Sequence, residues 1–170
     1  MFDEILHKPG YLHVLLNHLP IFGTALGALA LLVALVLRSR PAQITALVVV
    51  FVGSASAWPI LVTGQQAYKP IREMVDDDGS DWLDEHMARA ENTIYAFYLL
   101  AAVALAGLAA PRKWPRAATP LATTSFGLSL LCFGLAAYIA QAGGRVRHTE
   151  FRPEHPPQNS DSDLTHHHEH

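Results

Sequence analysis

The first long apolar run of the chain begins with side chains that can bind metals or protons. The stretch HVLLNHLPIFG, residues 13–23, carries two histidines, an asparagine and a proline. Imidazole is a ligand for haem iron, copper and zinc, and it titrates near neutral pH. Inside hydrocarbon, each of these polar groups is costly unless it has a partner. We therefore expect a buried polar site near the start of this run.

Two more histidines flank later apolar runs. His86 in EHMARAE precedes the third run, and His148 in GGRVRHTEFRP follows the fourth. His13 and His18 lie five positions apart, about 140° around an ideal helix, so one regular helix does not easily direct both at one ion. A shared site must therefore draw its ligands from different segments. Pro20 clashes with the carbonyl four residues before it, and the resulting kink can turn His18 inward.

Four apolar segments must position these side chains, and they cover residues 11–37, 42–63, 90–110 and 119–142. Each has about the 20 residues that cross a hydrocarbon layer, and none has the polar stripe of a soluble bundle helix. The composition agrees, because 51% of the residues are hydrophobic and 16% are charged. We predict an all-α membrane four-helix bundle of two transmembrane hairpins in one domain, residues 1–152. Residues 153–170, rich in Pro, Asp, Ser and His, are predicted to form a disordered tail.

An even number of spans places both termini and the long acidic middle loop, residues 64–89, on one side of the membrane. All four singled-out histidines then share that side, and the opposite side has none. The short loops on the opposite side concentrate positive charge, with Arg38, Arg40, Arg112, Lys113 and Arg116. Because basic loops tend to stay in the cytoplasm, we expect the histidine face and both termini to lie outside it.

Three chemistries fit this face. In the first, two neutral imidazoles on different helices bind b-type haem iron, with His18–His86 or His13–His148 as natural pairs and arginines near the propionates. In the second, three or four of these histidines bind copper or zinc together with Glu85 or Glu91. In the third, the histidines are structural groups or a proton relay. The polar neighbours expected to support the site are Asn17, Arg89, Arg145 and Arg147.

Several function classes are not indicated by the sequence. It has no H-E-x-x-H, G-x-S-x-G, Walker or dinucleotide motif, so we do not expect the chain by itself to be an enzyme. The net charge of -3 and the lack of a basic stripe speak against nucleic-acid binding. The single cysteine, Cys132, cannot form an internal disulfide, no C-x-x-C-H haem attachment motif occurs, and we expect Cys132 in the core.

The segments HVLLNHLPIFGTALG, TGQQAY, EHMARAE and GGRVRHTEFRP together resemble an uncharacterised bacterial family of four-helix integral membrane proteins, a domain of unknown function. The likeness covers about residues 11–152. It implies a bacterial inner-membrane protein, whose histidine face the loop charges would place in the periplasm of a Gram-negative host, and a pattern formed by His13, His18, His86 and His148 with Asn17, Pro20 and the Gly143–Gly144 pair. This chain has Gln65 and Gln66 where glutamate often follows the TG of the family, which weakens a metal role for that segment.

The functional expectation is therefore a membrane protein that binds haem b or a transition metal at its histidine face. Such a site would serve electron transfer or redox sensing beside a respiratory or other redox membrane partner. The alternative is a non-catalytic scaffold or accessory subunit whose histidines tie helix ends together. We expect the protein to be embedded in a lipid bilayer. The sequence is also compatible with a homo-oligomer.

Overall fold

The computed structural model describes residues 8–153, and this part of the chain is helical throughout, with short connections. The helices are α2 (Pro9–Leu16), α3 (His18–Val36), α4 (Arg40–Ala55), α5 (Ala57–Arg72), α6 (Asp77–Ala109) and α7 (Ala118–Arg147). Three short 3-10 turns are η1 (Ala110–Arg112), η2 (Pro115–Ala117) and η3 (Thr149–Phe151). Four helical stretches are long and apolar enough to cross a membrane, which confirms the expected four apolar helices and indicates a multi-pass membrane protein.

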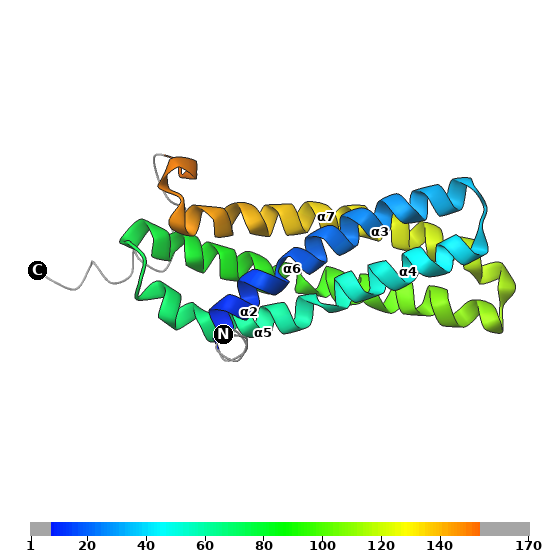
Figure 1. Ribbon diagram of the computed structural model, residues 1–170, viewed down its shortest axis with the longest axis horizontal. Coiled ribbons are helices and arrows are strands. Elements are labelled where there is room, and N and C mark those ends of the chain that lie inside the picture. Colours follow the sequence, from blue (N-terminus) through cyan, green and yellow to red (C-terminus); the bar gives the residue numbers. More distant parts are fainter. Residues whose placement is uncertain (1–7, 154–170) are drawn as a thin grey trace, which may run out of the picture.

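The first two helical stretches are each interrupted three residues before a proline. α2 gives way to α3 at Asn17, ahead of Pro20, and α4 gives way to α5 at Ser56, ahead of Pro59. A proline has no N–H to donate and its ring crowds the carbonyl four residues earlier. The helical hydrogen-bond ladder therefore breaks at both places. α6 has no internal proline and runs straight through the same level (Figure 1).

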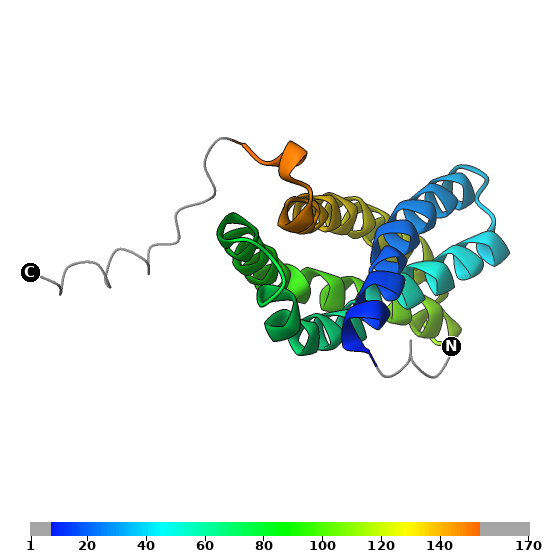
Figure 2. The same cartoon turned by 60° about the vertical axis from the view of Figure 1, so that its left-hand side comes forward.

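The four stretches pack lengthwise into a bundle. α3 packs against α4 and α7, α6 packs against α7 and α4, and α2 packs against α5 (Figure 2). α3 and α4 touch backbone to backbone, because a Cβ built on Gly23 would lie 2.5 Å from the Cα of Gly53. Such close approach through small residues is how helices associate where lipid provides no hydrophobic driving force.

The core between the helices combines large apolar side chains, such as Leu31, Leu47 and Leu100, with small polar ones. The carbonyls of their own helices satisfy the hydroxyls of Thr24 (to Pro20, 2.6 Å), Ser54 (to Val50, 2.7 Å) and Ser129 (to Ser125, 2.7 Å). Cys132 is fully buried, as expected. Other large apolar side chains cover the outside of the bundle, including Leu15, Phe22, Val36 and Leu131. An outer surface of this kind suits lipid and not water.

The helices extend well beyond the apolar runs, and the predicted long loop at residues 64–89 is mostly helical. α5 continues to Arg72, and α6 begins at Asp77. Asp76 makes this early start possible, because its side chain accepts the N–H of Gly79 (3.0 Å) as an N-cap. Arg72 also binds Asp84 across the two helices (2.8 Å). The apolar pattern predicted only the part of each helix that suits lipid. The polar extensions of α5 and α6 are stabilised by the Asp76 cap and the Arg72–Asp84 ion pair.

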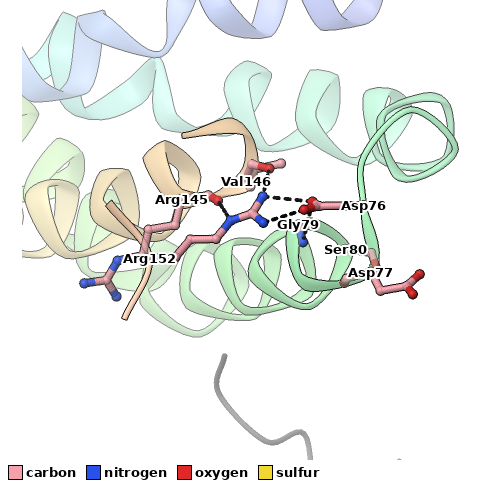
Figure 3. Close-up of polar contacts among 7 residues, drawn as sticks. All are labelled: Asp76, Asp77, Gly79, Ser80, Arg145, Val146 and Arg152. Atoms are coloured by element: carbon pink, nitrogen blue, oxygen red, sulfur yellow. Dashed lines mark hydrogen bonds and ion pairs between the residues drawn. The ribbon is translucent and has the colours of Figure 1, made fainter. Parts of the chain in front are cut away.

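The segment after α7 folds back onto the start of α6. The guanidinium of Arg152 donates to both carboxylate oxygens of Asp76, at 2.7 and 2.9 Å, and to the carbonyl oxygens of Arg145 and Val146, both at 2.8 Å (Figure 3). This contact brings the C-terminal end of α7 beside the α5–α6 connection. The predicted tail, apart from Pro153, lies outside the described residues.

Candidate functional site

His13 of α2 and His86 of α6 meet at the end of the bundle where α2 begins and α7 finishes. Their ring centroids are 6.2 Å apart and the ring planes are nearly perpendicular, at 88°. Both residues are half-buried. The sequence expected these two histidines on one face but paired each with a different partner, so the tertiary structure selects His13–His86 from the candidates.

Each ring of the pair donates a hydrogen bond to a backbone carbonyl of another helix. Nδ1 of His13 lies 3.0 Å from the carbonyl oxygen of Ile60 in α5, and Nδ1 of His86 lies 3.0 Å from that of Ile139 in α7. A carbonyl oxygen can only accept, so Nδ1 carries the hydrogen in both rings. In the neutral rings Nε2 then keeps its lone pair, which is the state that binds a metal.

A glycine lies against each imidazole and gives the ring access to the carbonyl oxygen to which it donates. Gly64 follows Ile60 by four residues, and Gly143 follows Ile139 by four. A helical side chain leans toward the N-terminus and covers the turn before it, so its absence exposes the carbonyl four residues back. A Cβ on either glycine would come within 3.0 Å of the Cε1 atom of the histidine above it.

The two halves of the site are therefore built in the same way. His13 rests on Ile60 and Gly64, and His86 rests on Ile139 and Gly143, with the same spacing and the same hydrogen bond. The segments TGQQAY and QAGGRVRH each contain one of these glycines. In the structure both Gly64 and Gly143 lie inside helices, in α5 and α7. Their function is to leave room for an imidazole.

Charged side chains tie the helices together around the pair. Arg89, one turn after His86, binds Glu85 (2.7 Å) and the carbonyl oxygen of Tyr138 in α7 (2.8 Å), and its guanidinium lies 3.8 Å from the Tyr138 ring centroid. Gln65 of α5 donates to Glu91 of α6 at 2.9 Å. Glu91 is exposed and engaged by this amide. These contacts hold α5, α6 and α7 at the level of the histidines.

Two of the four predicted histidines have other neighbours. His18 is exposed on the outer face of α3, where its ring stacks on Phe22 with centroids 6.1 Å apart. His148 is exposed after α7 and its Nδ1 lies 3.0 Å from Glu150. Within residues 8–153, no three His, Cys, Asp or Glu side chains form a group that could hold a metal ion. The site in the described chain is thus a two-histidine site.

The expected supporting residues differ in their surroundings. Asn17, one turn after His13, has a buried Oδ1 atom with no hydrogen-bond partner in the described chain. Arg145 lies over the ring of Trp82, with its guanidinium carbon 4.5 Å from the centroid, and donates to Phe151. Arg147 is exposed. Of the expected supporting residues, Arg89 lies beside His86, where it binds Glu85 and the Tyr138 carbonyl. Arg145 instead stabilises the segment that follows α7, through its bond to Phe151.

Sequence reasoning missed Ile60, Ile139, Gly64 and Gly143, although a signal was present: both glycines follow an isoleucine by four residues near the end of an apolar run. A comparison of the chain with protein families, curated proteins and solved structures found no match. The likeness to a bacterial membrane family that the motifs suggest therefore stays a prediction.

Proposed function

We propose that this is a multi-pass membrane protein whose His13–His86 pair binds one redox-active metal centre, haem b iron or a copper ion, and serves electron transfer or redox sensing. One observation carries the proposal: two imidazoles from different helices lie with their centroids 6.2 Å apart and their planes nearly perpendicular, and both Nδ1–H groups are already donated to carbonyls. Metal-bound histidines almost always donate their other ring N–H in this way, because the bond fixes tautomer and orientation.

The separation of the rings supports a shared ion. Two imidazoles that each bind one shared metal through a nitrogen at about 2 Å have ring centroids no more than about 6 Å apart, since each nitrogen lies about 1 Å from its centroid. The observed separation is 6.2 Å. The buried Oδ1 of Asn17, unpartnered in the described chain, adds an acceptor one turn deeper along the helix from His13.

The ligand count favours iron or copper over zinc. Zinc sites use three or four protein ligands, and no group of three is found in residues 8–153. Haem iron needs only two axial ligands from the protein, because the macrocycle supplies the other four. Copper in its monovalent state is also satisfied by two imidazoles. Both centres exchange single electrons, which zinc cannot do.

The membrane setting follows from the charges along α6. Residues 92–111 carry no charge and measure about 30 Å as a helix, which matches the hydrocarbon layer. His86 lies six residues before this stretch, about 9 Å outside it and at the level of the lipid headgroups. The short basic connections at the other end then face the cytoplasm. A centre at the headgroup level of the outer face is accessible to a soluble or membrane-bound redox partner.

The test uses the full chain purified in detergent from cells supplied with iron and copper. Haem gives a Soret band and a reduced-minus-oxidised difference spectrum, and copper gives one equivalent by elemental analysis. We expect either signal to be lost in both His13→Gln and His86→Gln. The matched controls His18→Gln and His148→Gln should retain it, and they carry the same His-rich tail, so metal bound by that tail cancels in the comparison.

The proposal fails if the wild-type chain and the His13→Gln and His86→Gln variants bind the same amount of haem and copper. The alternative is then a scaffold or accessory subunit. One observation favours it: the Nδ1–H bonds to Ile60 and Ile139 already join α2 to α5 and α6 to α7 without any metal. In that case the two variants should lower thermal stability in apoprotein that has been treated with a chelator.

A further inference from the structure

The end of the bundle opposite the histidine pair carries positive charge without any carboxylate. The α3–α4 and α6–α7 connections there hold five basic residues, Arg38, Arg40, Arg112, Lys113 and Arg116. Residues 8–72 and 92–149 contain no aspartate or glutamate. Residue 91 lies 16 positions before Gly107, about 24 Å along α6. Within residues 8–153 these cations therefore have no acidic side chain nearby, and they attract an anion from outside.

A recess of about 360 Å³ lies between the two connections. Arg38, Arg40 and Gln43 line one side of it, and Pro111, Pro115 and Thr119 line the other. Gln43 is 5% exposed, which makes it a buried polar group. The recess thus joins two guanidinium groups, an amide and a hydroxyl, and it has no acidic side chain in its lining.

Arg38 lines the recess at the left-handed position that ends α3, where the N–H of Ser39 donates to the carbonyl oxygen of Ala34 (3.0 Å). Its φ angle is 52°, in the left-handed region that favours glycine, and no other non-glycine residue of the described chain has a positive φ. Side chains at such positions are disfavoured by contact between Cβ and the backbone. Glycine is the usual residue at such a helix end, so arginine here adds a cation to the lining of the recess where the backbone itself favours glycine.

Arg40 is hydrogen-bonded only to neutral groups within the described chain. It donates to the carbonyl oxygen of Gly107 (2.8 Å), which is free because Pro111, four residues later, has no N–H. It also donates to Oε1 of Gln43 (3.3 Å), so the NH2 group of Gln43 remains a donor. Both partners are neutral. The polar groups of the recess are thus rich in donors, and phosphate oxygens are acceptors that arginine binds with matched geometry.

We propose that this recess binds the phosphate group of an anionic phospholipid headgroup. Arg38 and Arg40 flank the apolar ends of α3 and α4, and Pro111 follows the apolar end of α6, so the recess lies where headgroups lie in the proposed membrane setting. Basic pockets between helices on the cytoplasmic side suit such headgroups. The inference concerns the end of the bundle away from His13 and His86, and its failure leaves the proposed function untouched.

The test measures the thermal unfolding midpoint of the detergent-purified full chain against added phosphatidylglycerol, phosphatidylcholine or inorganic phosphate. We expect phosphatidylglycerol alone to raise the midpoint. Arg38→Gly removes the guanidinium and suits the positive φ, so the lipid-free midpoint should stay equal or rise. The apparent affinity for phosphatidylglycerol should fall about fivefold. The control Arg116→Gln removes one charge in η2 outside the recess lining and should leave the affinity within about twofold.

Three outcomes overturn the proposal. Equal protection by inorganic phosphate assigns the recess to a soluble anion instead of a lipid. An equal loss of affinity in Arg116→Gln and Arg38→Gly shows general surface charge without a defined pocket. An unchanged midpoint with phosphatidylglycerol removes the site altogether. Arg38→Lys, which keeps the charge, should retain more of the affinity than Arg38→Gly does.

Discussion

Arg152 donates two hydrogen bonds to Asp76, from Nη1 to Oδ2 at 2.7 Å and from Nη2 to Oδ1 at 2.9 Å (Figure 3). The two residues are 76 positions apart in the chain. The same Oδ1 accepts the N–H of Gly79 and caps α6. One carboxylate therefore starts the third long helix and fastens the segment after the fourth.

This pair gives the docked chain end a defined pH dependence. The hydrogen bond from Arg152 lowers the pKa of Asp76 below its ordinary value. A carboxyl group with a lower pKa in the folded state stabilises the fold above the unfolded pKa, about 4, and loses that effect as the pH falls through the folded pKa. The measurement is hydrogen exchange at the amides of Phe151 and Arg152, corrected for the intrinsic rate. We expect the corrected exchange rates to stay constant from pH 8 to 5 and to rise below about pH 4, where Asp76 becomes protonated.

Asp76→Asn should produce the same acceleration at neutral pH. Asp77→Asn is the matched control, because Asp77 lies in the same first turn and points away from Arg152 (Figure 3). Asp77→Asn removes one negative charge near the same helix terminus but leaves the Arg152–Asp76 hydrogen bonds in place. Equal exchange in the two variants would show that Arg152 does not hold the segment.

Gly64→Ala and Gly143→Ala should each disturb one half of the histidine site. The added Cβ would lie 3.0 Å from a histidine Cε1 and would cover the carbonyl to which Nδ1–H donates. We expect the free energy of unfolding in detergent to fall by about 1–3 kcal/mol, the usual cost of overpacking. Bound haem or copper should fall in parallel.

Gly134→Ala provides the control in the same helix as Gly143. Its Cβ would meet nothing within 4 Å, and replacing a helical glycine by alanine gains about 0.5–1 kcal/mol. The control should therefore stabilise the protein while the two site variants destabilise it. A stabilising effect at Gly64 or Gly143 would contradict the placement of the imidazoles.

Gly23→Ala should separate α3 from α4. The new Cβ would approach the Cα of Gly53 to 2.5 Å, and a backbone atom cannot move aside as a flexible side chain does. We expect a loss of about 1–3 kcal/mol or more in unfolding free energy, measured in detergent. Gly127→Ala, with nothing near its Cβ, is expected to be neutral or stabilising. An unchanged midpoint in Gly23→Ala would mean that the two backbones do not touch.

Arg89→Lys should weaken the tie between α6 and α7. Lysine keeps the charge but loses the fork that binds Glu85 and the Tyr138 carbonyl together. The Arg89 side chain is only 12% exposed, so we expect a loss of about 1–3 kcal/mol in unfolding free energy. Arg147→Lys on the exposed end of α7 should change it by less than about 0.5 kcal/mol. Similar values for both variants would remove the structural role of Arg89.

Apolar periodicity and length were enough to predict four long helices, because a helix in lipid needs about 20 uncharged residues and shows them directly in its sequence. The same signal failed for residues 64–89. Polar helices outside the lipid depend on caps and ion pairs, such as Asp76 with Gly79 and Arg72 with Asp84, which periodicity does not show. The parity of the spans brought His13 and His86 to one end of the bundle but did not pair them with each other.

The sequence by itself determined that imidazoles from several segments gather at one end of an apolar bundle, since that follows from the count of helices and the place of each histidine along them. Only the tertiary structure decided that His13 faces His86, while His18 turns outward onto Phe22. The choice depends on which helices approach closely, and that is set by the proline breaks and by glycines on partner helices far along the chain. Contacts between such distant positions leave no mark on the local pattern of either one.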